Sequence, residues 1–191
     1  MSEQTMKELM ITDILKVHLM DSMQTIYSQL SEQPDRFVVV LDDEKVPLYV
    51  ITADEMKRKM PRSLDWPSVR DFAARLPEAL LVDEKVALGR AMVFFHMMET
   101  SPRPPGLVVV RDKEVVGVLP YDVLADYFNK VTVPELEVKG QTVRKSQPVD
   151  VPNAVFRCRR YPRCSYKKTV SQVDESLLCK IPAHGRMVLV Q

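Results

Sequence analysis

The stretch that decides the fold is residues 37–60, FVVVLDDEKVPLYVITADEMKRKM, because a similar order of residues returns at 107–128 as LVVVRDKEVVGVLPYDVLADYF. In each copy a valine-rich run, typical of a buried strand, is followed by a polar turn and a second apolar run. Helix-forming residues then close the copy. The two copies lie roughly 68–70 residues apart, so the sequence predicts a duplicated unit.

The segments around each copy complete the unit. Residues 23–33 (MQTIYSQLSEQ) place apolar side chains at helical spacing before the first copy. Residues 80–82 and 84–98 predict a short strand and an apolar helix before the second copy. Residues 61–75 form the linker between the two units. Because each unit is too small to bury its sheet alone, we expect the two units to pack face to face.

This order of elements resembles the CBS-domain pair, or Bateman module, in which each repeat runs strand, helix, strand, turn, strand, helix. The last strand of the family's repeat reads roughly glycine, two apolar residues and threonine, with an aspartate three residues later. Residues 116–119 (VGVL) match the glycine and the strand, and residues 50–52 (VIT) supply the threonine. The resemblance covers about residues 8–130. It implies an α/β (α+β) fold of two tandem βαββα repeats, 8–60 and 76–130, packed as a pseudo-symmetric pair.

The resemblance also implies a ligand. In this family the cleft between paired repeats often holds an adenine nucleotide such as AMP or ATP. The threonine hydroxyl faces the phosphates, and the aspartate carboxylate accepts hydrogen bonds from the ribose. Carried over to this chain, these roles fall to Thr52 and Glu55 in the first repeat and to Asp122 in the second. A carboxylate pairs well with two neighbouring hydroxyl groups, and apolar strand residues can hold a base.

The sequence departs from the family's pattern in both repeats. Tyr49 stands where the first repeat's glycine is expected, and Glu55 is one methylene longer than aspartate. In the second repeat Pro120 takes the threonine position and Val123 the aspartate position, with Asp122 beside it. At most one half-site therefore keeps its polar pair. We expect a non-enzymatic regulatory or sensor protein; the alternative is a ligand-free dimerisation scaffold or interaction adaptor. The resemblance implies a homodimer.

Beyond residue 130 the composition changes. Residues 131–152 have the proline, glycine and polar content of a linker, and residues 153–191 form a basic tail. The tail holds every cysteine of the chain, in the spacing Cys-x5-Cys, fourteen residues, Cys-x4-His: Cys158, Cys164, Cys179 and His184. Three thiolates and one imidazole are a complete tetrahedral set for structural zinc. The tail resembles a small zinc ribbon, and we expect it to contact a partner protein. The alternative is three unrelated thiols and a surface histidine.

The net charge of +1 conceals an uneven distribution. Residues 1–138 hold 16 Lys and Arg against 23 Asp and Glu, a net charge of −7, and residues 139–191 hold 11 against 3, a net charge of +8. A basic tail with interleaved tyrosines can bind nucleic acid through phosphate contacts and stacking, which is a further alternative function. The other interpretation is that the two parts attract each other or stay soluble. The residues concerned are Arg157, Arg159, Arg160, Arg163, Lys167, Lys168, Tyr161 and Tyr166.

The remaining patterns argue against several classes of protein. No apolar run approaches the ~20 residues that cross a bilayer. The first residues lack a basic segment followed by an apolar one, and three cysteines are not the even number of a secreted disulfide framework. We therefore expect a cytoplasmic protein without a membrane partner. No Ser-His-Asp order, glycine-rich phosphate loop or paired-carboxylate pattern is present, so we expect no enzyme.

Overall fold

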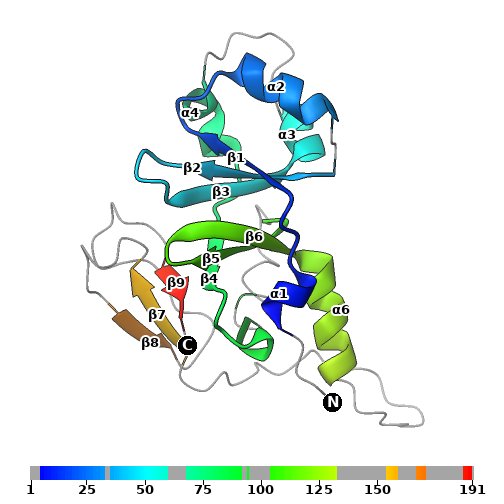
Figure 1. The fold of residues 1–191 in the computed structure, drawn as a ribbon, viewed down its shortest axis with the longest axis vertical. Helices are drawn as coiled ribbons and strands as arrows, with labels where there is room; N and C mark the ends of the chain where they lie inside the picture. The colour runs from blue at the N-terminus through cyan, green and yellow to red at the C-terminus, as the bar shows by residue number, and fades with distance from the viewer. Residues whose placement is uncertain are drawn as a thin grey trace.

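The computed structural model describes residues 5–32, 35–59, 68–91, 94, 104–132, 154–158, 167–170 and 187–190. Over these residues it has two stacked sheets, one of three strands and one of six, with helices on the outer side of each (Figure 1). We call residues 14–76 the first unit and residues 80–132 the second unit, as far as each is described.

The first unit has β2 at the centre of its sheet, parallel to β1 and antiparallel to β3. Its strands are β1 (Ile14–His18), β2 (Phe37–Leu41) and β3 (Pro47–Thr52). Its helices are α2 (Met23–Glu32), α3 (Ala53–Lys59), α4 (Val69–Phe72) and the 3-10 helix η1 (Ala73–Arg75).

The second unit repeats this plan. Strand β5 is parallel to β4 and antiparallel to β6, and the elements are β4 (Leu80–Asp83), the 3-10 helix η2 (Leu88–Ala91), β5 (Gly106–Arg111), β6 (Glu114–Pro120) and α6 (Tyr121–Thr132). Phe37 pairs with Thr52 in the first sheet, as Gly106 pairs with Pro120 in the second, and a β-bulge follows Val40 in one copy and Val109 in the other. The predicted duplication of the βαββα unit is therefore confirmed, and this register sets the equivalence of the two copies.

Burial on both faces explains the valine-rich strands. In β2, Phe37, Val39 and Leu41 belong to the cluster between the two sheets, whereas Val38 and Val40 belong to the cluster beneath the helices of the first unit. Strand β5 alternates in the same way. We call the cluster between the sheets the inter-sheet core: Ile14, Phe37, Val39, Leu41, Val50, Ala79, Leu81, Val108, Val110, Val115, Val118 and Val188. The expected face-to-face packing of the units is thus present.

In each unit, the residues before the first strand cross to the other unit and form backbone hydrogen bonds with its third strand. Ile11, ahead of β1, exchanges two backbone hydrogen bonds with Val118 of β6, at 2.8 and 2.9 Å. Ahead of β4, the N–H of Ala79 donates to the carbonyl of Leu48 in β3 at 2.9 Å. Helix α1 (Met6–Leu9) lies against the second unit, because its Met6 is buried in that unit's outer cluster. These crossings join the two sheets through the backbone.

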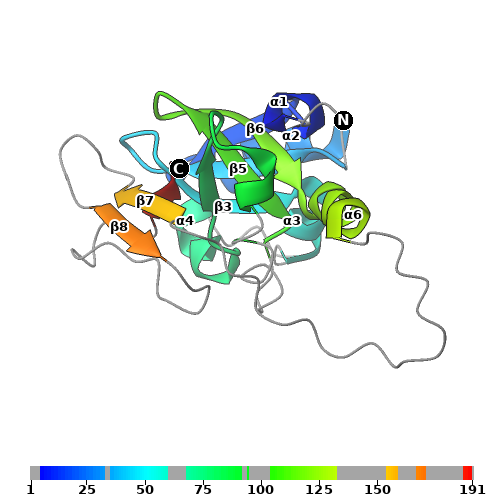
Figure 2. The ribbon, with the colours of Figure 1, turned by 90° about the horizontal axis from the view of Figure 1, so that it is seen from below.

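The tail strands extend the sheet of the second unit. Strand β9 (Met187–Leu189) pairs in parallel with β4, and β7 (Ala154–Cys158) and β8 (Lys167–Val170) follow it outward to the edge farthest from α6 (Figure 2). Phe156 is fully buried and packs edge-on against Phe94, with ring centroids 5.8 Å apart. Where the sequence suggested a small β unit of its own, the described tail strands share the core of the second unit.

Part of the expected linker also packs into the fold. Of residues 61–75, those from 69 onward form α4 and η1, and Val69 and Ala73 are buried. Val69 contributes to the outer cluster of the first unit together with Leu76. The short length of these helices, four and three residues, explains why the sequence pattern did not reveal them.

We predict that Gly117→Ala destabilises the protein by about 1–3 kcal/mol. Gly117 lies on β6 where residues 10 and 11 cross, and a Cβ there would stand 2.8 Å from the carbonyl oxygen of Ile11 and 3.0 Å from the sulfur of Met10. Gly89→Ala is the matched control, because nothing lies within 4 Å of its added Cβ. Urea denaturation measures both variants; an equal free energy of unfolding for the two would contradict the crossing.

Candidate functional site

Two of the predicted ligand residues meet where β3 runs into α3. The hydroxyl oxygen of Thr52 accepts a hydrogen bond from the backbone N–H of Glu55 at 3.2 Å. Such a bond satisfies an amide of the first helical turn that has no partner within the helix. The Glu55 carboxylate forms an ion pair with Lys59 one turn later, at 2.8 Å. Both residues are partly exposed, so the junction presents a hydroxyl and a carboxylate side by side.

Arg36 is a third polar residue at this junction, and the sequence analysis did not identify it. Its backbone carbonyl accepts the N–H of Ala53 at 2.8 Å, which fixes Arg36 beside Thr52. Its guanidinium Nη2 forms an ion pair with Asp13, while its Nε is buried and has no hydrogen-bond partner among the described residues. A buried donor of a charged group is costly to leave without an acceptor, and an anionic ligand could supply one.

Asp122 lies in the second unit, exposed on the first turn of α6. The strand pairing equates Thr52 with Pro120 and Ala53 with Tyr121, so Val123 takes the position of Glu55 and Asp122 lies one residue before it. This is the equivalence expected from the sequence. Within the described residues no hydrogen bond or ion pair joins Asp122 to Thr52 or Glu55. The second unit has neither a hydroxyl nor a carboxylate at the two corresponding positions.

The second unit has no equivalent of Arg36 either. Pro105 takes its place, because the carbonyl of Pro105 accepts the N–H of Tyr121 at 2.9 Å as the carbonyl of Arg36 accepts that of Ala53. A proline has no charged side chain to offer a ligand. An arginine directly before a buried strand, where the other copy has a proline, was the sequence signal for Arg36.

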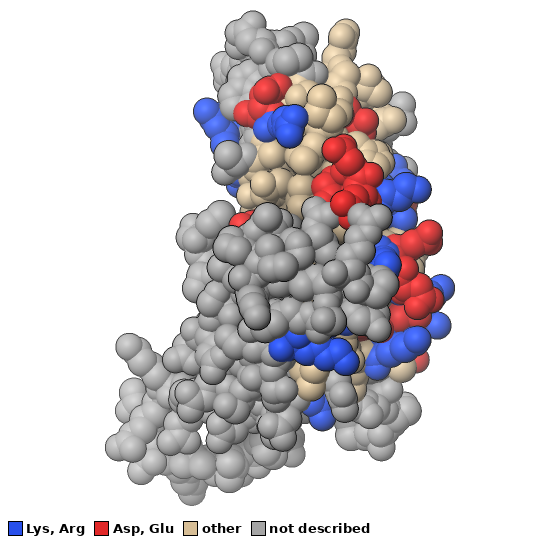
Figure 3. Space-filling model, turned by 90° about the vertical axis from the view of Figure 1, so that its left-hand side faces the viewer, with Lys and Arg blue, Asp and Glu red and all other residues tan. Residues whose placement is uncertain are grey.

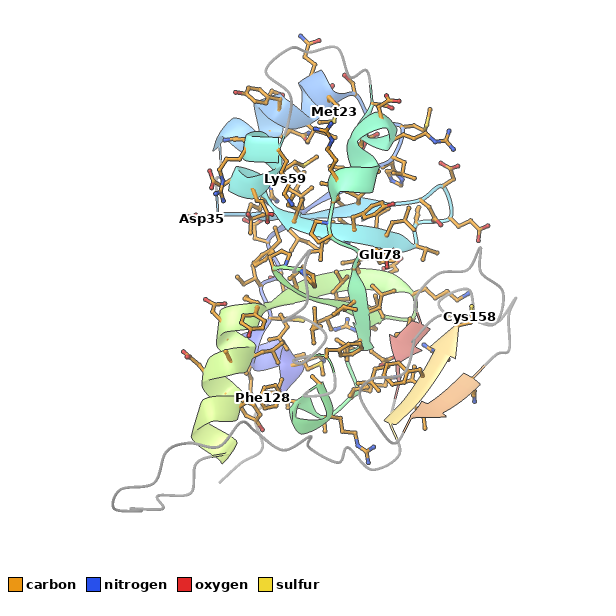
Figure 4. All side chains as sticks on the ribbon, turned by 180° about the vertical axis from the view of Figure 1, so that it is seen from behind. Met23, Asp35, Lys59, Glu78, Phe128 and Cys158 are labelled. Carbon is orange, nitrogen blue, oxygen red and sulfur yellow. The ribbon has the colours of Figure 1, made fainter. Side chains whose placement is uncertain are left out.

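The candidate ligand residues and the tail lie on opposite sides of the molecule. Figure 4 shows Asp35 and Lys59 at one side of the first unit, and Cys158 at the other side of the second. Helix α3 and strand β7 are separated in the same way in Figure 1. Cys158 is therefore far from the end of β3 and the start of α3, where Thr52 and Glu55 lie.

The predicted zinc ligands fall only partly within the described residues. Cys158 is fully buried at the end of β7, in the same apolar cluster as Phe156 and Leu189. The other three predicted ligands, Cys164, Cys179 and His184, lie outside the described residues. Within the part of the chain that the structure describes, no three His, Cys, Asp or Glu residues are grouped to hold a metal ion. The zinc site stays a prediction.

The nucleic-acid interpretation of the tail also stays a prediction. Arg157 of β7 forms an ion pair with Asp83 of β4 at 3.4 Å, across the intervening strand β9, so one basic residue of the tail has a partner within the fold. Lys167 is exposed and pairs with Arg157 across β7 and β8. On the described part of the face in Figure 3, acidic and basic side chains are mixed. That surface does not present the single-sign field typical of a nucleic-acid interface.

Comparison with solved structures identifies the fold. A CBS domain-containing protein of unknown function from Kribbella flavida aligns with 66% of this chain and 99% of its own, at 15% identity and a TM-score of 0.51. The soluble part of a magnesium transporter aligns with 70% of this chain and 50% of its own, also at 15% identity and a TM-score of 0.51. The chain therefore has the fold of a CBS-domain pair, as predicted; identity this low shows the fold alone.

A third similar structure is a CBS-domain pair with bound AMP from Klebsiella pneumoniae, which aligns with 65% of this chain and 98% of its own, at 17% identity and a TM-score of 0.47. No family model matches the sequence, and no curated protein is similar to it. None of the helices in the described residues is long and apolar enough to cross a membrane.

The shifted pKa values lie away from the candidate ligand site, after β4. The side chain of Glu84 accepts a hydrogen bond from Nε of Arg111 at 2.5 Å and is 8% exposed. This hydrogen bond lowers the pKa of Glu84 below its ordinary value and raises the pKa of Arg111. A carboxyl group with a lowered pKa in the folded state stabilises it above the ordinary pKa, and the contribution is lost as the pH falls through the lowered value.

We predict that Glu84→Gln reduces the loss of stability on acidification. The wild-type protein binds fewer protons at this group folded than unfolded, so its free energy of unfolding falls as the pH drops below about 4.5. The variant lacks this contribution, so its free energy of unfolding is lower at neutral pH and falls less as the pH drops. Urea denaturation at a series of pH values measures it, with Glu44→Gln on the exposed β2–β3 turn as control. Parallel profiles for Glu84→Gln and wild type would contradict the assignment.

Proposed function

We propose that this chain is a non-enzymatic regulatory protein whose CBS-type pair, residues 8–60 and 76–130, binds an adenine nucleotide at the first unit. The observation that carries the proposal is the buried Nε of Arg36, which has no acceptor among the described residues and lies beside Thr52. A guanidinium placed in this way is a receptor for a phosphate oxygen. The adenine part of the ligand comes from the family resemblance, and the phosphate part from Arg36.

Each of the three side chains has a distinct role in the proposed complex. Arg36 donates to the phosphate in the forked geometry that suits guanidinium and phosphate. Thr52 accepts the N–H of Glu55 with its oxygen, so its own O–H stays available to donate to a second phosphate oxygen. Glu55 uses one carboxylate oxygen for Lys59 and accepts a ribose hydroxyl with the other. The second unit, with Pro105 and Pro120 at the positions of Arg36 and Thr52, holds no phosphate in this proposal.

We predict that AMP, ADP or ATP raises the melting temperature of the wild-type protein by about 5–10 °C when the ligand is present at about 100 times its Kd. Arg36→Gln and Thr52→Val abolish the shift, because each removes a donor to the phosphates. Arg58→Gln removes the same charge from an arginine of α3 that is 72% exposed, and Thr52→Ser keeps the hydroxyl; both retain the shift. Thermal unfolding followed by fluorescence tests this, and a wild-type protein indifferent to all three nucleotides would refute the proposal.

The alternative function is a dimerisation scaffold without a ligand. It is favoured by the fact that Thr52 and Glu55 already have partners within α3. In either function we propose a homodimer, following the resemblance. Native mass spectrometry separates the two functions, since a sensor carries or takes up a nucleotide-sized adduct and a bare scaffold does not.

We further propose that the tail binds one zinc ion through Cys158, Cys164, Cys179 and His184 and contacts a partner protein. In support, Cys158 pairs with Met187 across β7 and β9, and Met187 is only three residues beyond His184. Residues 158 and 187 are therefore neighbours in the sheet. Such closeness is required if ligands near both ends of the segment between them bind one ion.

We predict one zinc ion per chain in freshly purified protein, released when a mercurial reagent titrates the thiols. Cys179→Ser lowers the zinc content to less than about one-tenth, because three ligands hold the ion far more weakly than four. Cys179 is preferable to Cys158 for this test, since the latter is buried in the core. Protein purified without chelator that contains no metal would contradict the zinc site.

A further inference from the structure

Among the described residues, Asp13 is the ion-pair partner of Arg36. Its Oδ1 meets Nη2 of the guanidinium, and the side chains of Asp13 and Arg36 are 65% and 29% exposed. An ion pair this exposed is weak, because water competes for both groups. The Asp13 carboxylate can therefore be displaced by another anion without disturbing the core.

The segment that carries Asp13 leads directly into the second unit. Two residues earlier, Ile11 exchanges its pair of backbone hydrogen bonds with Val118. One residue before that, Met10 lies against Gly117, so closely that no side chain would fit there. Helix α1 then places Met6 in the outer cluster of the second unit. The ion pair with Arg36 is a side-chain link between this crossing segment and the first unit, one residue before the backbone pairing of β1 with β2 begins at Ile14.

We propose that Asp13 is a built-in competitor for the ligand's phosphate, and that its displacement transmits ligand occupancy to the second unit. The idea rests on the proposed nucleotide binding at Arg36. A carboxylate and a phosphate present the same oxygen acceptors to one guanidinium, and two anions at this distance repel each other. Phosphate binding therefore expels Asp13, and the crossing segment loses this side-chain link to the first unit while it keeps its backbone pairing with β6 and, from Ile14 onward, with β2. By thermodynamic linkage, the Asp13–Arg36 ion pair weakens ligand binding by the same factor by which the bound ligand weakens the ion pair.

The test is calorimetric titration of the full-length protein with AMP and ADP. Asp13→Asn removes the competing charge, and the expected result is a Kd about two- to fivefold lower than in the wild type, the range that an exposed ion pair supports. Asp54→Asn is the matched control. Asp54 is 59% exposed, lies two residues after Thr52 and has its own partner in Arg58, so it makes the same charge change near the site without releasing Arg36. Its Kd is expected to stay at the wild-type value.

Hydrogen exchange of peptides covering residues 6–11 tests the transmission. In the wild type, ligand binding is expected to speed exchange at the Ile11 amide, which donates to the carbonyl of Val118. In Asp13→Asn the exchange is expected to be fast already without ligand and to change little on binding. Unchanged exchange at this amide in every state would overturn the transmission.

The possible failures are distinguishable. If neither the wild type nor Asp13→Asn binds AMP or ADP, the proposed function fails, and the role of Asp13 falls with it. If the wild type binds and Asp13→Asn binds equally well or more weakly, the nucleotide site stands and the competitor role is overturned. An equal fall in Kd in Asp13→Asn and Asp54→Asn would also overturn it, because the effect would then come from the net charge near the site and not from the release of Arg36.

Discussion

The structure depends on the apolar contact between the two sheets. Neither three-stranded repeat can bury its sheet alone, and the inter-sheet core supplies the second face for both. This requirement explains why β2 is buried at every position and β5 at every position but its last, Arg111. It also explains the crossings at Ile11 and Ala79, where the residues before one unit's first strand form backbone hydrogen bonds with the sheet of the other unit. Strand β9 extends the same interface, since Val188 belongs to the inter-sheet core.

Within this shared framework the two units differ where a ligand would bind. The first unit has Arg36 at the start of β2 and Thr52 at the end of β3. The second has Pro105 and Pro120 at the same positions, which offer neither a guanidinium nor a hydroxyl group. The duplicated fold therefore carries a single candidate phosphate site. The second unit instead provides the strand to which the tail is anchored, β4.

The sequence predicted the elements that depend on local patterns. The valine-rich strands, the turns between them and helices α2, α3 and α6 were found because each has enough residues to show a periodicity. The parallel pairing of β9 with β4 was not predictable, because it joins residues about a hundred positions apart and leaves no local signal. Arg36 was missed because an arginine before a strand normally faces solvent, and only the Asp13 contact and the buried Nε distinguish it.

The measurement that tests this account most directly is hydrogen exchange mass spectrometry of the intact protein with and without saturating AMP, read at the strand ends of both units. The account predicts slower exchange at residues 52–59, where β3 runs into α3, and no change at residues 119–123, where β6 runs into α6. Equal protection at both junctions, or protection confined to the second unit, would contradict the claim that only the first unit retains a phosphate-binding site.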